Sequence, residues 1–306
     1  MTRTLSFPES YSVGELFSLN GGMPTYIGQA TKVVSINDDA QVKLSVNADG
    51  AVNLGWIQEI DPANIHTFSL YAQRVNIADL AYLTSLQNLH ELDLGQMKPH
   101  KIMKFGKGDE VAWVPGQPGD VDASLTILSK FPRLARLILA GSGAGDNCLD
   151  HLRASHSLEL LDLERTAIGD TAISNLCLLK GLKILDLEGT AIGDASLAQV
   201  CCIDSMQVLD VDGTQVTDAG VVYLSRLKNL RWLRAANTQI QGTTLGHLRQ
   251  LQNLHTIELS GTPVNDQAVP VLCTMQQLTE LLVSNSQISA AGMQRLKTAL
   301  PNCEVQ

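Results

Sequence analysis

The chain lacks the features that mark a membrane protein or a nucleic-acid-binding protein. Its 306 residues contain no apolar run of 18 residues and no basic segment followed by an apolar one at the N-terminus. We therefore expect neither a membrane span nor a Sec signal, although a signal for another secretion route would leave no such mark. The 22 Lys and Arg face 31 Asp and Glu, a net charge of −9. This balance argues against nonspecific nucleic-acid binding, which depends on cations meeting phosphates.

Catalytic and cofactor-binding patterns are lacking as well. The N-terminal 60 residues offer no Gly-rich phosphate loop, no Ser/His/Asp order and no Cys/His pair that we can assign. The six cysteines lack the paired spacings of a zinc site or of a secreted disulfide framework. We therefore predict no enzyme activity, no catalytic residues, no cofactor and no bound metal.

The chain does have a regular internal repeat. Apolar residues recur every 24 positions at Leu134, Leu158, Leu182, Met206, Leu230, Leu254 and Leu278. We count these residues as position 1, and the windows then share the template L-x-x-L-x-L-x-x-T-x-I-x-D-x-x-L-x-x-L-x-x-L. Position 9 is Thr or Ser in all seven windows, namely Ser142, Thr166, Thr190, Thr214, Thr238, Thr262 and Ser286. Self-similarity at one fixed period indicates a solenoid of stacked units.

Each repeat combines two local patterns. Positions 4 and 6 alternate with polar neighbours, as in a short half-buried strand, whereas positions 13, 16, 19 and 22 have the spacing of a short helix. We expect the position 9 hydroxyls to bond backbone groups in the turn after the strand. Carboxylates stand just before the helical run, where each can cap the first turn that follows it; these are Asp170, Asp194, Asp218 and Asp266.

The repeat resembles that of bacterial leucine-rich repeat proteins of the same 24-residue type, from at least Ile65 to the C-terminus. The resemblance implies an α/β repeat solenoid, a horseshoe with parallel strands on its concave face and short helices on its convex side. It also implies a bacterial protein that binds other proteins. Cys177, Cys201 and Cys273 share position 20, and we expect them to be reduced thiols. This favours the bacterial cytoplasm, or a host cytosol after secretion by a non-Sec route.

We predict two regions in the chain. Residues 1–64 form an N-terminal cap, in which the alternation over Lys32–Ile57 indicates a β-meander. Residues 65–306 form nine repeats, with a closing segment at about 298–306. The step from Leu89 to Leu134 is 45 residues, so that repeat carries 45 − 24 = 21 extra residues, at about 97–119.

Two segments are candidates for a binding surface. In the family that the repeat resembles, positions 2, 3, 5, 7 and 8 point out of the concave face. Three consecutive repeats place six carboxylates there: Asp162, Glu164, Asp186, Glu188, Asp210 and Asp212. Strands lie ~4.8 Å apart, so like charges in one row repel by about 0.8 kcal/mol per close pair even in water. A shared function or a recent duplication explains why the charges persist. Beside them stand Arg231, Trp232 and Arg234, a composition typical of an interface anchor.

The 21-residue insertion is the second candidate, because it is basic and aromatic in an acidic chain. We predict a hairpin between Ile102–Phe105 and Val111–Val114 that turns at Gly106–Asp109 and overhangs one rim of the concave face. A disordered excursion without a role is the alternative. The side chains most suited to contact a partner are Lys101, Lys104, Phe105 and Trp113.

The residues thus favour a non-enzymatic module that recognises a protein or peptide with a basic surface. We expect this module to bind neither nucleic acid nor a membrane. The alternatives are a bacterial effector in a host cell, or a subunit or adaptor of a ubiquitin-ligase-like enzyme. Cys202 and Asp204 have the Cys-x-Asp form of some bacterial ligases of this repeat class, but here it lies inside a repeat. His66 and His90 share position 2 with Glu91 and Asp93 close by. Surface histidines are commoner than a zinc site, so we predict no metal there.

Overall fold

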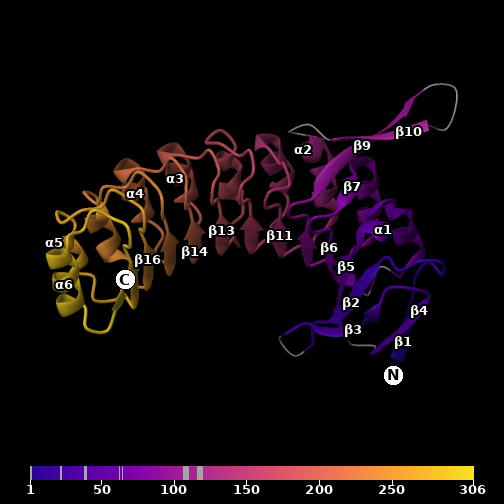
Figure 1. Ribbon diagram of the computed structural model, residues 1–306, viewed down its shortest axis with the longest axis horizontal. Helices are drawn as coiled ribbons and strands as arrows, with labels where there is room; N and C mark the ends of the chain where they lie inside the picture. The colour runs from indigo at the N-terminus through magenta and orange to yellow at the C-terminus, as the bar shows by residue number, and fades with distance from the viewer. Residues whose placement is uncertain are drawn as a thin grey trace. The chain divides into compact units, whose positions relative to one another are not determined.

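The computed structural model describes residues 2–20, 23–37, 40–61, 63, 65–105, 110–115 and 120–306, with side chains omitted for 2, 3, 99–105, 110–115 and 120. The chain divides into two compact units, Met1–Leu158 and Glu159–Gln306 (Figure 1). We call them unit 1 and unit 2. Among the described residues, no helix has both the length and the apolar character that crossing a membrane requires.

Unit 1 begins with antiparallel strands. Strand β1 (Thr2–Ser6) pairs with β4 (Val33–Asn37), and β2 (Gly14–Ser18) pairs with both β3 (Thr25–Gln29) and β5 (Val42–Val46). Val42–Val46 also pairs with the following strand β6 (Ile65–Ser69), in parallel. In this pairing Leu44 lies opposite Phe68, 24 residues later. The repeat register therefore starts one unit earlier than the sequence indicated.

The predicted β-meander over Lys32–Ile57 is wrong in its last part. After β5, the chain forms α1 (Ala48–Ala51) and the 3-10 helix η1 (Leu54–Glu59) instead of a further strand. Two asparagines start these turns, because Asn47 accepts a hydrogen bond from the Gly50 N–H and Asn53 from the Gly55 N–H. The helical turns still bury Leu54 and Trp56, so apolar alternation over so short a stretch did not distinguish them from a strand.

The rest of unit 1 follows the repeat. In order, its elements are β7 (Arg74–Asn76), η3 (Ile77–Ser85), β8 (Glu91–Asp93), β9 (Lys98–Phe105), β10 (Glu110–Pro115), α2 (Asp120–Ser124), η4 (Leu125–Lys130), β11 (Arg136–Ile138) and η5 (Asp146–Leu152). The strands β11, β8, β6 and β5 lie side by side in parallel.

The predicted hairpin in the insertion is present. Strands β9 and β10 pair antiparallel, with Ile102 opposite Trp113, and β9 also pairs in parallel with β7. The predicted turn at 106–109 lies outside the described residues. The hairpin therefore extends a small sheet that is separate from the parallel sheet of the repeats.

Unit 2 consists of regular repeats. Its strands run in parallel in the order β12 (Leu160–Asp162), β13 (Ile184–Asp186), β14 (Val208–Asp210), β15 (Trp232–Arg234), β16 (Thr256–Glu258), β17 (Glu280–Leu282) and β18 (Glu304–Val305). Its helices are η6 (Ile173–Leu178), α3 (Asp194–Val200), α4 (Asp218–Leu224), η7 (Leu245–Gln250), α5 (Val269–Leu272) and α6 (Ala290–Ala299). Helices α3 and α4 lie on the side opposite to strands β13 and β14 (Figure 1). Helix α6 ends before Pro301, and β18 closes the stack as predicted.

Two ladders hold the repeats together. The side chains at positions 4 and 6, such as Leu185 and Leu187, are at most 2% exposed in every repeat from that of β6 to that of β17. The threonine hydroxyls at position 9 donate to the carbonyl three residues earlier; Thr190 Oγ1 lies 2.6 Å from the Leu187 oxygen, and Thr214 Oγ1 lies 2.6 Å from the Val211 oxygen. The serine hydroxyls of Ser142 and Ser286 instead accept from the backbone N–H two residues later. Both predictions are confirmed, and they explain why a Thr column recurs beside the Leu columns.

The predicted caps act across repeats, not within their own helix. Asp170 accepts hydrogen bonds from the backbone N–H groups of Gly193, at 2.8 Å, and Ser196, at 3.0 Å, in the next repeat. Burial alone would raise the pKa of Asp170, but the hydrogen bonds from Ser196 and Gly193 hold it below its ordinary value. The same bond to the next repeat is made by Asp194, Asp218 and Asp266. Each Asp therefore ties two neighbouring helices together.

The expectation of reduced thiols is wrong for one cysteine of position 20. Cys177 and Cys202 form a disulfide, with Cα atoms 5.6 Å apart, whereas Cys201 is a buried free thiol. The bond joins position 20 to position 21 of the next repeat, a separation of 25 residues, so comparing equal positions did not find it. Disulfides persist mainly in oxidising compartments, and the cysteines thus give no support to a cytoplasmic location.

Candidate functional site

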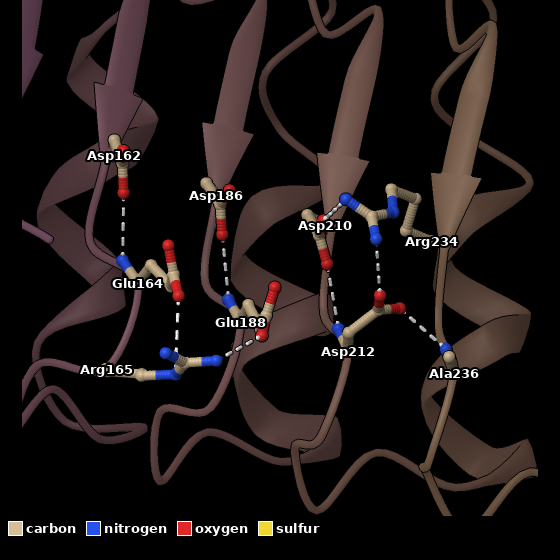
Figure 2. A network of polar contacts seen from close by, with 9 residues as sticks. All are labelled: Asp162, Glu164, Arg165, Asp186, Glu188, Asp210, Asp212, Arg234 and Ala236. Atoms are coloured by element: carbon tan, nitrogen blue, oxygen red, sulfur yellow. Dashed lines mark hydrogen bonds and ion pairs between the residues drawn. The ribbon is translucent and has the colours of Figure 1, made fainter. Parts of the chain in front are cut away.

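The six predicted carboxylates lie together on three neighbouring strands of unit 2 (Figure 2). Asp162 is opposite Asp186, and Asp186 is opposite Asp210, in the parallel register of β12, β13 and β14. Side-by-side placement of these three aspartates was the main expectation from the repeat alignment, and it is confirmed. We call the six residues the acidic grid; they are Asp162, Glu164, Asp186, Glu188, Asp210 and Asp212.

The aspartates at position 5 have a local structural role. Their Oδ1 atoms accept hydrogen bonds from the backbone N–H two residues later, from Glu164 to Asp162 at 3.0 Å and from Asp212 to Asp210 at 2.9 Å. Glu258 does the same with the N–H of Ser260, at 3.0 Å. These contacts satisfy the N–H groups where each strand ends. An acidic side chain at position 5 therefore serves the turn of its own repeat, although other repeats turn with Ile138, Arg234 or Leu282 at this position.

Arg234 neutralises the C-terminal end of the grid. Its Nη1 lies 2.9 Å from Asp210 Oδ2 and its Nη2 lies 3.1 Å from Asp212 Oδ2. Asp212 also accepts a hydrogen bond of 2.6 Å from the N–H of Ala236. Asp210 is 3% exposed and Asp212 is 7% exposed, so the expectation that all of positions 5 and 7 are open to solvent does not hold here. The guanidinium and the backbone cover both carboxylates.

Arg165 makes a similar but more exposed clamp. Its guanidinium lies 3.3 Å from Glu164 Oε1 and 3.2 Å from Glu188 Oε1. Its backbone has φ = 51°, in the left-handed region, where the next two repeats have Gly189 and Gly213 at φ = 65°. A side chain other than Gly or Asn is disfavoured at such a backbone position. Arg165 keeps this conformation while bridging two carboxylates, and sequence reasoning missed it although Glu164 and Arg165 are adjacent.

Burial makes the grid less acidic than its composition suggests. Desolvation raises the pKa of Asp186 to about 6, with further repulsion from Asp162 and Glu164. Desolvation also raises the pKa of Asp210 to about 7, although Arg234 opposes this rise. The pKa of Asp212 is raised for the same first reason. Asp186 and Asp210 therefore hold a proton more readily than an ordinary aspartate does.

Trp232 is the most distinctive side chain on this face. It begins β15, next to Val208 and Thr256 of the adjacent strands, and is 53% exposed. Arg231 beside it is exposed as well. A hollow of about 290 Å³ adjoins the indole and is lined by Trp232, Arg234, Thr256, Glu258, Glu280 and Leu282. Sequence reasoning named two of these residues and missed the four on β16 and β17.

Comparison with known proteins agrees with this architecture. A family model described as a leucine-rich repeat matches residues 205–225. Internalin C2 of Listeria monocytogenes superposes with a TM-score of 0.54 and 22% identity, over 72% of this chain and 81% of that one. An internalin of the same organism, inlF, gives 0.49 and 16% over 86% and 85%. The plant peptide hormone receptor RGFR1 in complex with RGF2 gives 0.49 and 14% over 79% and 36%. No curated protein matches the sequence.

The fold is a leucine-rich repeat solenoid. The likeness to internalin C2 concerns the fold alone, because the identity is only 22%. Such repeats serve in general as protein-interaction modules.

Two groups in the leucine-rich repeats have the donor types of a cation site. Oxygen atoms of Glu188, Asp210 and Asp212 lie within 4.8 Å of one another, but Arg165 and Arg234 already pair with them. In unit 1, the rings of His66 and His90 stack with centroids 5.5 Å apart. The nearby Glu91 pairs with Arg136 at 2.8 Å. Both arrangements are satisfied by the protein's own groups, and we assign no metal to either.

Two remaining sequence candidates have different outcomes. Lys101, Lys104, Phe105 and Trp113 fall in the paired strands β9 and β10, but their side chains lie outside the described part of the structure. Cys202 of the Cys-x-Asp motif is bonded to Cys177. In this state it has no thiolate, and a thiolate is what a ligase nucleophile requires.

Proposed function

We propose that this leucine-rich repeat protein is a non-enzymatic recognition module that binds a protein partner on the strand face of unit 2. The observation that carries the proposal is Trp232. Its indole is 53% exposed although the strand that holds it is fixed by the buried Leu233, which is 1% exposed. An exposed aromatic on a rigid strand gives a partner a large apolar contact at little cost in conformational entropy.

The charge of the same face indicates the kind of partner. Glu164 and Glu188 are half-buried, and the formal charge of the grid with its two arginines is −6 + 2 = −4. An acidic face raises the association rate of a basic partner and repels an acidic one. We therefore propose a protein or peptide with a basic surface, and neither nucleic acid nor a membrane.

The hairpin of β9 and β10 is proposed as a second contact region. Support for this comes from its composition, with Lys101, Lys104, Phe105 and Trp113, and from the antiparallel pairing that gives it a defined backbone. Long ordered excursions from a rigid scaffold are often used for binding.

Three narrower roles are proposed from the sequence: a bacterial effector, an endogenous scaffold, and an adaptor of a ubiquitin-ligase-like enzyme. An effector and a scaffold differ in whether the partner comes from a host or from the native organism. An adaptor would bind a ligase without providing the nucleophile. The disulfide of Cys177 and Cys202 leaves Cys202 without the thiolate that a ligase nucleophile requires, which favours a binding role over catalysis by Cys202.

The proposal is tested by affinity capture with matched variants. The parent chain, Trp232→Ala and Tyr223→Ala are used as baits in lysates of the native organism and of candidate hosts. Tyr223 is a fair control because it is an aromatic of unit 2 that is 42% exposed, on helix α4 instead of a strand. We expect a partner that the parent and Tyr223→Ala retain and that Trp232→Ala loses. Equal retention by all three baits contradicts the strand face as the interface.

Charge and hairpin variants of the captured complex give further tests. Glu164→Gln with Glu188→Gln should slow association and flatten its salt dependence, because both side chains reach solvent. Replacing residues 101–115 by a short Gly-Ser linker should weaken binding without unfolding the repeats. The replacement leaves the pairing of Lys98 and Pro99 with strand β7 in place. Unchanged affinity after the replacement removes the hairpin from the interface.

A further inference from the structure

The hollow beside Trp232 is formed by two rows of side chains across three strands of unit 2. The register of β15, β16 and β17 places Trp232, Thr256 and Glu280 in one row and Arg234, Glu258 and Leu282 in the next. These six residues enclose the volume of about 290 Å³. All six belong to adjacent, regularly hydrogen-bonded strands, so the hollow is a fixed feature of the sheet.

The hollow exists because its central side chains are short or turned aside. Thr256 is the small residue between a Trp and a Glu in its row. Glu258 turns its carboxylate toward the N–H of Ser260, at 3.0 Å, and Glu280 accepts a hydrogen bond of 3.2 Å from the Thr256 hydroxyl. Glu258 therefore leaves the space above Thr256 open, whereas Glu280 leans toward Thr256 and forms one side of the hollow. The opening between the outer walls is large enough for one side chain of a partner.

The walls of the hollow are apolar at two corners. Trp232 presents its exposed indole on one strand, and Leu282 is half-buried two strands away. The guanidinium of Arg234 pairs with Asp210 and Asp212 on the side away from β16, so its aliphatic stem is the part left to line the hollow. An apolar side chain that enters would be in contact with an aromatic ring, a leucine and methylene groups.

The lining of the hollow includes two carboxylates, those of Glu258 and Glu280, beside Arg234. Among the described residues, no Lys or Arg forms an ion pair with Glu258 or Glu280, whereas the acidic grid has Arg165 and Arg234. Glu304 of β18 lies next to Glu280 in the sheet and adds a third carboxylate. Glu258 and Glu280 are diagonal neighbours on adjacent strands, and such neighbours lie ~7–8 Å apart, within reach of long side chains. One ammonium or guanidinium group of a partner placed between them can therefore contact both carboxylates. These carboxylates are therefore available to a cation of a partner, in addition to the net negative charge of the grid.

We propose that this hollow binds a protein segment in which an apolar side chain stands next to a lysine or arginine. The apolar side chain occupies the space between Trp232 and Leu282 above Thr256, and the cation pairs with Glu258 and Glu280. The inference rests on the proposed function, and it specifies the sequence that the strand face selects. A hydrophobic contact fixes the lifetime of such a complex, while the charges set its selectivity.

The test is a selection of short random peptides, displayed on phage, on the immobilised full chain. Enriched peptides are then measured against Thr256→Phe, which fills the hollow without changing any charge, and Thr256→Ser, which leaves it open and keeps a hydroxyl for Glu280. Glu258→Gln with Glu280→Gln removes the charges. Its control is Glu59→Gln with Asp204→Asn, which changes the net charge equally at exposed positions outside the strand face.

We expect the enriched peptides to share an apolar residue beside a Lys or Arg. Thr256→Phe should weaken them by about tenfold or more, and Thr256→Ser should bind like the parent. The double Gln variant should weaken peptides with the basic residue and leave versions with Gln in its place unchanged. Leu282→Ser tests the same wall if thermal melting shows that Thr256→Phe does not fold.

The failures are distinguishable. Selection that yields no apolar–basic sequence, or peptides that Thr256→Phe binds like the parent, overturns the inference about the hollow. If those peptides still lose affinity on Trp232→Ala, the strand face binds peptides elsewhere and the proposed function stands. If Trp232→Ala has no effect either, both proposals fail.

Discussion

Replacing Arg234 by Gln should destabilise unit 2 in a way that depends on pH. Arg234 is the cation for Asp210 and Asp212, whose side chains are only 5% and 10% exposed. Breaking a buried ion pair by removing one partner costs about 3–5 kcal/mol. The Arg234 side chain itself is 48% exposed, so solvent screening reduces the loss, and we expect about 2 kcal/mol at pH 8.

The pH dependence follows from the direction of the pKa shifts. The pKa of Asp210 is raised from 3.8 to about 7 in the folded chain, so between these values the folded state holds more protons than the unfolded state. Its contribution therefore favours folding in acid and is lost as the pH rises through 7. Arg234 lowers the pKa of Asp210, so replacing Arg234 should raise that pKa further. At pH 5.5 the neutral carboxyl needs no cation, and the loss should fall to about 1 kcal/mol or less.

The measurement is denaturant unfolding of the parent, Arg234→Gln and Arg165→Gln at pH 5.5 and 8. Arg165 is the matched control because it also bridges two carboxylates, but its side chain is 68% exposed and theirs are 31% and 28% exposed. We expect it to cost about 0.5 kcal/mol or less at either pH. Equal losses for the two variants, or a loss from Arg234→Gln that does not change with pH, would refute the account of the grid.

Three further predictions concern the frame of the repeats. Thr190→Val should cost about 1–3 kcal/mol, because it removes the donor to the buried Leu187 carbonyl; the denaturation midpoint measures this. Asp218→Ala should cost about 1 kcal/mol or more, because the carboxylate accepts N–H groups of the next repeat; calorimetric melting tests it. Cys177→Ser should cost about 3 kcal/mol by releasing the disulfide to Cys202, and thiol titration of the unfolded parent should find four free thiols.

Each of these predictions has a control in the same unit. Thr279→Val changes an exposed Thr outside position 9, Asp204→Asn changes an exposed acid without a capping role, and Cys273→Ser changes a free thiol. Variants and controls that melt alike would show that the hydroxyl ladder, the inter-repeat caps or the disulfide contributes little. Six titrated thiols would support the cytoplasmic location predicted from the sequence.

The repeat period allowed the register of the strands to be predicted. A 24-residue step places Asp162, Asp186 and Asp210 in one row whatever the curvature of the stack, and the pairing shows this row. The repeat period carries no information on how deeply a side chain is buried, so it did not predict the burial of Asp210 and Asp212. The guanidinium of Arg234 covers both carboxylates. Because Arg234 stands in the same row as Asp210, the sequence did contain a signal for this ion pair.

Other features depend on contacts between different positions of neighbouring repeats. Asp170 caps the helix after its own, and Cys177 bonds to position 21 instead of position 20. Aligning equal positions does not reveal such diagonal contacts. The hollow above Thr256 depends on the relative sizes of side chains in three strands and on where Glu258 turns, and only the folded chain shows both.

The central claim is that the strand face around Trp232 holds the partner. Surface plasmon resonance of the captured partner on the parent, Trp232→Ala and Tyr223→Ala tests it most directly. We predict that Trp232→Ala speeds dissociation by the equivalent of about 2 kcal/mol or more, with little change in association rate, and that Tyr223→Ala matches the parent. Dissociation of Trp232→Ala at the parent's rate would contradict the claim.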